Sequence, residues 1–368
     1  MSAGVYIHIP FCKSRCSYCD FATDVYRTSD SVERYVAALC REIRSFSSPG
    51  IDIDTIYLGG GTPSLLSPPQ LRSILVQIGE VFDISGDAET TMEMNPATVT
   101  PESLLAYRQS GVNRASFGVQ TFNELDLKLL ARGHDANDAR NTFRMLREAG
   151  FDNVSLDLIA GLPGQSIDDW RRNLNEAVSM ESEHLSLYLL EVHEGTPLAE
   201  QLRSGRRPMP DEELVAEMYE IMIDTLADAG YRQYEISNFA KPGFESRHNS
   251  KYWRMDPVYG FGVSAHSFDG RERYANDRDT NAFVDRIEKT GSAEVSRETI
   301  DFASESVFLG LRLNDGVDVE SHRLRFGADL TEKVPPLKAN GLVEVREGRL
   351  RLTRRGMLFS NDVFAEFI

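Results

Sequence analysis

Residues 6–21 read YIHIPFCKSRCSYCDF, and the three cysteines of this stretch decide how the rest of the chain is interpreted. Cys12, Cys16 and Cys19 follow the spacing C-x3-C-x2-C. Iron–sulfur clusters prefer cysteine ligands, and three thiolates can hold three irons of a [4Fe–4S] cube. The fourth iron then has no protein ligand and can bind a small molecule. The spacing therefore predicts a cluster that takes part in chemistry.

Two other interpretations of the three cysteines remain open from spacing alone. A zinc site would need a fourth ligand, for which His8 or Asp20 is available. Disulfide bonding is the second, although four cysteines in 368 residues do not make a disulfide scaffold. Cys40 falls on the apolar stripe of a predicted helix, which favours a packing role for its side chain.

The composition predicts a globular protein without a membrane span. Hydrophobic residues make up 41% and charged residues 26% of the chain, and no apolar run is long enough to cross a bilayer. The sequence enters the strand-like segment Val5–Ile9 almost at once and lacks a signal-peptide pattern, so with free cysteines we expect a cytoplasmic protein. A net charge of −17 argues against nucleic acid as a partner. A monomer and a homodimer are both compatible with the sequence.

The first 240 residues alternate β runs with amphipathic helices, which predicts a parallel sheet covered by helices. The first helix is expected from about Ser31 to Phe46, with Asp30 as its N-cap. Partial-barrel and open-sheet arrangements both place sites beyond the carboxyl ends of the strands. The predicted strands are Val5–Ile9, Thr55–Leu58, Thr90–Met94, Arg114–Val119, Asn153–Ile159 and Leu185–Leu190.

The chain changes character after residue 240. Residues 241–295 are rich in Gly, aromatics and His, and we expect a connecting segment there. The remaining residues, 296–368, predict helices and then a β-hairpin with its turn at Glu347-Gly348, which resembles a winged helix. We therefore expect a barrel over 1–240, a connecting segment over 241–295 and a small C-terminal domain over 296–368.

Glycines and polar side chains follow the predicted strands. The run Gly59–Pro63 (GGGTP) comes after the second strand, where glycines let the backbone approach a ligand closely. It lies one βα unit after the cysteine loop, so the two loops should be neighbours. Each polar residue alone is compatible with a structural role, but together they predict a ligand pocket: Glu93, Gln120, Arg132 and Asp157.

These motifs together resemble the radical S-adenosylmethionine (SAM) superfamily. Within it, the chain resembles the group that contains the oxygen-independent coproporphyrinogen III oxidases and related heme chaperones. The resemblance covers nearly the whole chain and implies an α/β fold, a partial (β/α)6 TIM-type barrel with a small winged-helix-like C-terminal domain. It also implies that Cys12, Cys16 and Cys19 hold one [4Fe–4S] cluster per chain. SAM would chelate the fourth iron and be cleaved to a 5′-deoxyadenosyl radical.

The resemblance further implies residues that bind SAM. Gly60, Gly61 and Thr62 match the glycine motif that holds the methionine end, while Tyr6 and Glu93 match other residues around this SAM. In the oxidases a second SAM is held at positions that match a further set. The matching residues here are Tyr18, Gln120, Arg132 and Asp157, and Tyr18 replaces a Phe. The number of SAM molecules bound, one or two, is therefore left open.

Two departures from the oxidase pattern favour the heme chaperone subgroup. Phe21 stands where the oxidase has a further cysteine, and the five residues before Tyr6 leave no room for the oxidase's N-terminal extension. Residues 248–253 (HNSKYW) match the H-N-x-x-Y-W motif of the chaperones. An imidazole can ligate heme iron and aromatic rings can pack on a porphyrin, so His248 is the first expected heme ligand and His266 the second.

The resemblance therefore implies a heme chaperone rather than an enzyme of porphyrin biosynthesis. Such a protein binds a [4Fe–4S] cluster, SAM and heme, and it delivers heme to apo-hemoproteins such as respiratory enzymes. The alternative is an oxygen-independent coproporphyrinogen III oxidase, which carries out a radical SAM oxidative decarboxylation.

Overall fold

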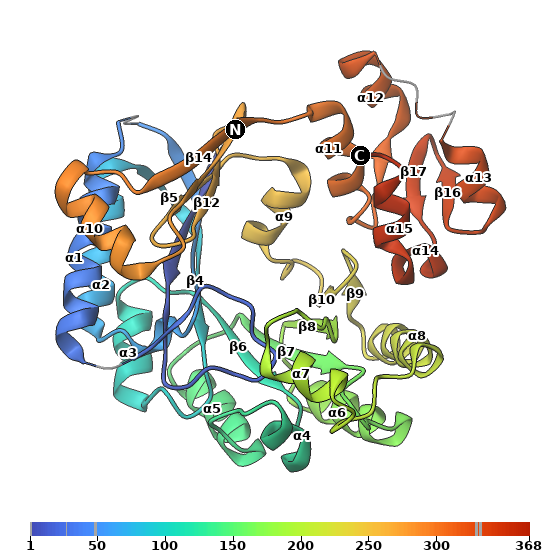
Figure 1. Cartoon of the computed structure of the whole chain (residues 1–368), viewed down its shortest axis with the longest axis horizontal. Coiled ribbons are helices and arrows are strands. Elements are labelled where there is room, and N and C mark those ends of the chain that lie inside the picture. The colour runs from blue at the N-terminus through green and yellow to red at the C-terminus, as the bar shows by residue number, and fades with distance from the viewer. Residues whose placement is uncertain (1, 27, 48–49, 328–329, 331–332) are drawn as a thin grey trace.

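A single twelve-stranded sheet lies at the centre of the computed structural model, which describes residues 2–26, 28–47, 50–327, 330 and 333–368 (Figure 1). The edges of the sheet are β14 and β9, so the described strands form an open arc. From edge to edge the strands are β14 (Glu294–Thr299), β13 (Glu272–Asn276), β12 (His266–Phe268), β11 (Val258–Phe261), β1 (Ala3–Ile9), β4 (Asp52–Gly60), β5 (Asp83–Met94), β6 (Arg114–Gln120), β7 (Val154–Ala160), β8 (His184–Leu189), β10 (Asn238–Ala240) and β9 (Arg232–Gln233).

The six predicted strands are confirmed, and they run parallel in the order β1-β4-β5-β6-β7-β8. The structure adds β11 as a further parallel strand beside β1, with Val5 opposite Tyr259. Strand β11 falls within residues 241–295, where we expected a connecting segment. Its four residues are all buried, because they complete the sheet on the open side of β1.

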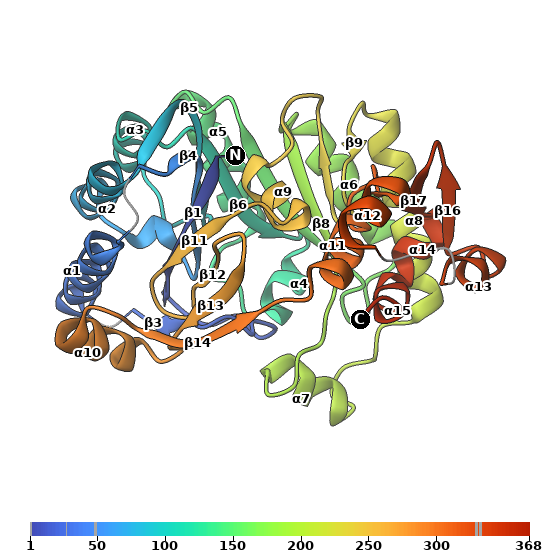
Figure 2. The same ribbon diagram turned by 90° about the horizontal axis from the view of Figure 1, so that it is seen from above.

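Helices cover the outer face of the parallel strands (Figure 1). The predicted N-cap Asp30 was wrong: Thr28 caps α1, since its hydroxyl accepts from the Ser31 amide, and Asp30 lies in the first turn. The helices are α1 (Ser29–Ser45), α2 (Pro68–Val81), α3 (Pro101–Gln109), α4 (Glu124–Leu129), α5 (Ala136–Glu148), α6 (Ile167–Ser179), α7 (Pro197–Arg203) and α8 (Glu212–Asp228), with a 3-10 turn at Pro63–Leu65. Helix α7 projects from the body of the molecule (Figure 2).

The predicted connecting segment is part of this architecture, since it supplies β11–β14 and the helices α9 (Arg247–Arg254) and α10 (Thr280–Thr290). The histidine motif was expected in a loop but lies in α9. Ser246 caps this helix through the Asn249 amide, and Met255 closes it in the left-handed conformation. Lys251 Nζ lies 2.7 Å from Asp54 Oδ1 on β4, which ties α9 to the sheet.

The C-terminal residues form a small three-stranded sheet, β15-β17-β16, with five helices around it (Figure 2). The predicted hairpin is confirmed: Glu347 and Gly348 both have positive φ, as a tight turn between β16 and β17 requires. The elements are α11 (Phe302–Gly310), β15 (Val317–Asp318), α12 (Val319–Phe326), α13 (Val334–Ala339), β16 (Val343–Arg346), β17 (Arg349–Leu352), α14 (Arg354–Leu358) and α15 (Ser360–Ala365).

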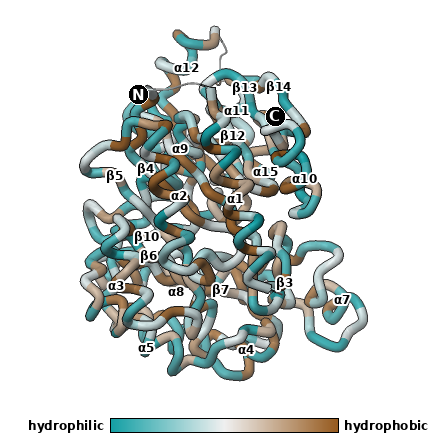
Figure 3. Tube along the Cα trace, turned by 90° about the vertical axis from the view of Figure 1, so that its left-hand side faces the viewer, coloured by the Kyte–Doolittle hydropathy of each residue, from teal (hydrophilic) through white to brown (hydrophobic). Residues whose placement is uncertain are grey.

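The main apolar cluster is built from the central strands and the helices packed against them. Figure 3 colours the chain trace by the hydropathy of each residue. The C-terminal elements have an apolar cluster of their own around Leu350 and Val363. Among the described residues, no helix combines the length and the apolarity needed to cross a bilayer. The small flanking strands β2 (Phe11–Cys12) and β3 (Asp24–Val25) pair with each other and brace the cysteine loop.

Candidate functional site

A cavity of about 580 Å³ lies at the carboxyl ends of the parallel strands. This is the edge at which ligand sites occur in sheets of this kind. The loops after β1 and β4 and the ends of β5–β8 all contribute to it. The structure brings most of the predicted residues to its wall: Cys12, Cys16, Cys19, Tyr18, Gly60, Gly61, Thr62, Glu93, Gln120, Arg132 and Asp157.

The glycine loop and the cysteine loop are direct neighbours, as predicted. Parallel pairing of β1 and β4 sets Ile9 beside Gly60. The Gly61 amide donates to the Ile9 carbonyl at 2.8 Å, and the Thr62 amide donates to the Phe11 carbonyl at 2.8 Å. A Cβ at Gly60, whose φ is +109°, would lie 2.6 Å from the His8 ring. Only glycine allows this close approach of the glycine loop to the segment that follows β1.

We expect Gly61→Ala to destabilise the site, because its Cβ would lie 2.8 Å from the Pro10 backbone. Pushing two backbones apart typically costs about 1–3 kcal/mol. Urea unfolding measures this cost. Gly86→Ala is the matched control, since nothing lies within 4 Å of its added Cβ. Equal stability of the two variants would contradict the close packing of the loops.

The cysteine sulfurs make polar contacts with two other residues of the cavity wall. Thr62 Oγ1 donates to Cys12 Sγ at 3.6 Å, and Arg132 Nη1 donates to Cys16 Sγ at 3.3 Å. Burial raises the pKa of the Cys12 and Cys19 thiols. The Thr62 hydrogen bond acts in the opposite direction on the pKa of Cys12.

The arrangement bears on the two alternatives left open by the spacing. All four cysteines are free thiols. In the described part of the chain, no three His, Cys, Asp or Glu side chains converge where one metal ion could bind. A single zinc needs its ligands around one point, whereas a [4Fe–4S] cube binds each thiolate at a different iron. Three free thiols on one cavity wall fit a [4Fe–4S] cluster, which does not require its ligands to meet at one point.

Glu93 is a half-buried carboxylate beside the glycine loop. Tyr57 Oη donates to its Oε1 at 2.7 Å, and the Gly60 amide donates to its Oε2 at 3.0 Å. Burial raises the pKa of Glu93, and these two hydrogen bonds act against that rise. A carboxylate fixed in this way can accept hydrogen bonds from a ligand's amino group.

Two further charged residues of the cavity carry unsatisfied buried atoms. Arg132 Nη2 donates to the Gly118 carbonyl at 2.6 Å, but its Nε has no partner among the described residues. Asp157 Oδ1 is likewise buried without a partner in that part of the chain. Buried polar atoms are normally hydrogen-bonded, so the unpartnered Arg132 Nε and Asp157 Oδ1 on one cavity wall fit a polar ligand.

Asp157 should make stability depend on pH. Burial raises its pKa from 3.8 to about 7, with nearby Glu93 adding to the rise. The folded state therefore binds more protons between these pH values, and stability falls as the pH increases from about 4 to 7.

Asp157→Asn should flatten that slope in cluster-free protein and raise the unfolding free energy at pH 8 by roughly 1–4 kcal/mol. Urea unfolding from pH 4.5 to 8 tests this expectation. The exposed Asp152→Asn is the control. An unchanged slope in Asp157→Asn would show that its carboxyl has an ordinary environment.

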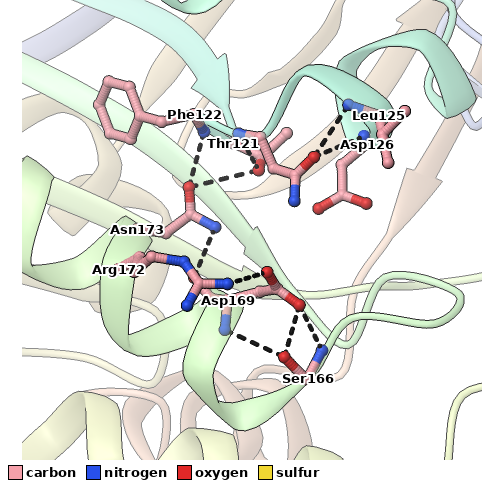
Figure 4. Close-up of polar contacts among 9 residues, drawn as sticks. Thr121, Phe122, Leu125, Asp126, Ser166, Asp169, Arg172 and Asn173 are labelled. Atoms are coloured by element: carbon pink, nitrogen blue, oxygen red, sulfur yellow. Dashed lines mark hydrogen bonds and ion pairs between the residues drawn. The ribbon is translucent and has the colours of Figure 1, made fainter.

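Gln120 ends β6 in the left-handed conformation, with φ at 69°. The turn that follows is fixed by Asn173 of α6 (Figure 4). Asn173 Oδ1 accepts from the Phe122 amide at 2.6 Å and from the Thr121 hydroxyl at 3.3 Å. This network holds the backbone next to Gln120, so the side chain is presented from a rigid turn.

Tyr6, His248 and His266 lie outside this cavity. Tyr6 lines a second cavity, and its hydroxyl is hydrogen-bonded to His8 Nδ1 at 3.0 Å. His248 is 1% exposed, and both of its ring nitrogens are engaged, with Thr55 Oγ1 at 2.9 Å and with Tyr252 Oη at 3.2 Å. Burial, with Lys251 and Arg114 nearby, lowers its pKa to about 3. In this conformation neither ring nitrogen is free to bind iron.

The sequence interpretation missed several residues of the site. Tyr57 orients Glu93. It could have been found from the sequence, because residues two apart in a strand share one face, and Tyr57 lies two residues before Gly59. His193 and Arg312 also line the cavity. Arg312 comes from the C-terminal part of the chain, and no local pattern points to its place here.

The open parallel barrel, with a three-cysteine loop after β1 and a glycine loop after β4, defines the radical SAM class of proteins. The model of the Radical SAM superfamily matches residues 6–177, and that of the HemN C-terminal domain matches residues 298–359. The solved structure of the coproporphyrinogen III oxidase HemN from Escherichia coli is similar over 100% of this chain and 90% of that chain, with a TM-score of 0.88 and 25% identity.

The curated relatives narrow the assignment. The heme chaperone HemW of Bacillus subtilis is 39% identical over 377 residues, which cover 99% of each chain. The heme chaperone HemW of Lactococcus lactis is 36% identical, covering 99% of this chain and 97% of that one. The chain therefore belongs to the HemW family of radical SAM proteins.

Proposed function

We propose that this protein is a heme chaperone, which binds heme and delivers it to apo-hemoproteins such as respiratory enzymes. The observation that carries the proposal is the similarity to HemW over 99% of both chains, at 39% identity. The oxidase structure is similar in fold at 25% identity. Phe21, which replaces the further cysteine of the oxidase pattern, supports the same choice.

Cys12, Cys16 and Cys19 are proposed to hold one [4Fe–4S] cluster per chain. The donor set fits, because three free thiols line one cavity. Arg132 adds a positive charge next to Cys16, which compensates part of the negative charge of a thiolate-bound cluster. When bound, the cluster and SAM supply one-electron chemistry that ends in a carbon-centred radical.

SAM is proposed to bind between the glycine loop and Glu93. Gly60 and Gly61 line the cavity together with Glu93, and Glu93 is fixed to accept hydrogen bonds from an amino group. Tyr6 matches a SAM-binding residue by resemblance. Because Tyr6 lines the second cavity, we propose that it acts indirectly, by orienting His8 through its hydroxyl. The unpartnered atoms of Arg132 and Asp157 support a second polar ligand, held together with Tyr18 and Gln120.

The remaining predictions about partners and organisation are kept as proposals. The acidic balance, with a net charge of −17, favours a protein partner over nucleic acid. A cytoplasmic location and the division at residues 240 and 295 belong to the same proposal, and so does a homodimer. Ligation of heme iron by His248, the first ligand expected from the sequence, would require α9 to release its ring from Thr55 and Tyr252.

Anaerobic incubation of reconstituted protein with coproporphyrinogen III and SAM separates the chaperone from the oxidase. We expect heme to bind in a saturable titration and coproporphyrinogen III to remain unchanged. Formation of protoporphyrinogen IX at a rate similar to that of an oxidase control would overturn the proposal. An absence of saturable heme binding would overturn it equally.

A further inference from the structure

Only two of the seven histidines have exposed side chains, which limits the choice of heme ligand. The other five are buried, and each has at least one ring nitrogen hydrogen-bonded within the protein: His8, His134, His184, His248 and His322. His193 is exposed but lies 3.6 Å from Glu191, in the cavity that also contains the cysteines. The ring of His266 makes no hydrogen bond or ion pair in the described part of the chain.

His266 lines a second cavity of about 440 Å³. The cavity lies next to the first one, because Asp20 and Phe21 line both. A smaller pocket of about 90 Å³ adjoins it, since Tyr252 and His266 line both of these. The imidazole therefore lines a space, made of this second cavity and the smaller pocket, that neighbours the cavity of the cysteine loop.

The wall of this space offers what a heme group needs. Phe21 is 66% exposed and Tyr252 is 37% exposed, so two aromatic rings are available to a flat apolar ligand. Arg278 lines the same cavity, is exposed, and has no ion pair among the described residues. A free guanidinium suits a carboxylate such as a heme propionate. A neutral imidazole can complete the set as an axial ligand.

We infer that heme binds in this second cavity, with His266 as the iron ligand, Phe21 and Tyr252 against the porphyrin, and Arg278 on a propionate. The inference rests on the proposed function and names the site where its cargo sits. Phe21 then has a direct role, since the residue that replaces the oxidase cysteine supplies a packing surface for heme. The cargo lies next to the cluster cavity, not inside it.

The histidine motif acts on this site through its tyrosine. His248 Nε2 is hydrogen-bonded to Tyr252 Oη, one turn further along α9. The His248 ring also stacks on the Tyr57 ring, with 5.1 Å between the ring centroids. The edge of Tyr252 also meets the His248 ring, with 5.4 Å between centroids. His248 is therefore a positioning residue that orients Tyr252 toward the cavity, while its own nitrogens stay inside the protein.

Heme titration of the reconstituted full-length protein tests the assignment, with the visible and EPR spectra of the ferric complex as a readout of the axial ligand. His266→Ala should weaken heme binding at least tenfold and change the spectrum, and added imidazole should restore the wild-type spectrum. His193→Ala should leave affinity and spectrum unchanged. His248→Ala should weaken binding through Tyr252 but keep the spectrum of a histidine-ligated heme.

The propionate contact has its own test. Arg278→Gln should lower the affinity for heme several-fold but leave the affinity for heme dimethyl ester unchanged, and the exposed Arg271→Gln is the control. A wild-type spectrum in His266→Ala, or a spectrum lost in His193→Ala or His248→Ala alone, would overturn the assignment. If the wild-type protein itself binds no heme, the proposed function fails, which is a different outcome.

Discussion

Replacing any one of Cys12, Cys16 and Cys19 with Ser should leave the reconstituted protein without a stable [4Fe–4S] cluster, whereas Cys40→Ser should keep it. Each of the three thiols lines the same cavity, and each would bind a different iron of the cube, so none can substitute for another. Cys40 lies in α1 and packs against the hydrophobic core. Iron and sulfide content, with the EPR signal of the reduced cluster, measures the outcome.

The serine variants should fold as well as the wild-type apoprotein, because all three thiols are only partly buried. Thermal unfolding of the apoproteins checks this point. A full cluster in any of the three variants would remove that cysteine from the ligand set. Loss of the cluster in Cys40→Ser would show that the spacing C-x3-C-x2-C was assigned to the wrong thiols.

Glu93→Gln should cost the protein most of its affinity for SAM while the cluster stays in place. The amide oxygen can still accept from the Gly60 amide, and the amide NH2 can donate to Tyr57 Oη, so the local structure is retained. It loses the charge that a ligand's ammonium group requires, and a charged hydrogen bond contributes about 1.5–3 kcal/mol, or roughly 10- to 150-fold in affinity. The change in the EPR spectrum of the reduced cluster on adding SAM reports the binding.

Glu102→Gln is the control for this variant, since Glu102 is an exposed residue of the first turn of α3. It should bind SAM as the wild type does. Unchanged SAM affinity in Glu93→Gln would mean that the carboxylate serves only to anchor Tyr57 and the glycine loop.

Much of the barrel is predictable from local sequence patterns. Alternating apolar segments and helix signals place the six parallel strands, and the order of the strands brings the GGGTP run next to the cysteine loop. The hairpin turn at Glu347-Gly348 follows from its flanking apolar residues. These features depend on neighbours in sequence or on one βα unit, so few long-range contacts are needed to anticipate them.

The strands and helices of residues 241–295 could not be predicted from local sequence patterns. Strand β11 is only four residues long, and its pairing with β1 joins segments that are about 250 residues apart. Helix α9 is eight residues long and is held by contacts with β4, such as Lys251 with Asp54. Segments this short show too little hydrophobic periodicity to predict a helix or a strand. Their structure is stabilised by packing on a sheet that is distant in sequence.

The same limit explains the outcome for the candidate site. The shared position of Glu93, Gln120 and Asp157 on one cavity wall was predictable, because strand ends meet at one edge of a parallel sheet. His248 is chemically able to bind heme iron, but its burial against Thr55 could be seen only once α9 was placed on β4. The free imidazole of His266 belongs to a hairpin of the sheet that the sequence did not reveal.

The central claim is that the protein carries heme to another protein, and heme transfer tests it most directly. The reconstituted protein, loaded with heme, is mixed anaerobically with a heme-stripped respiratory cytochrome, and the Soret band of the holo-cytochrome is followed. We predict that the cytochrome acquires heme faster from the loaded protein than from an equal amount of heme on serum albumin. Transfer no faster than from albumin would contradict the account.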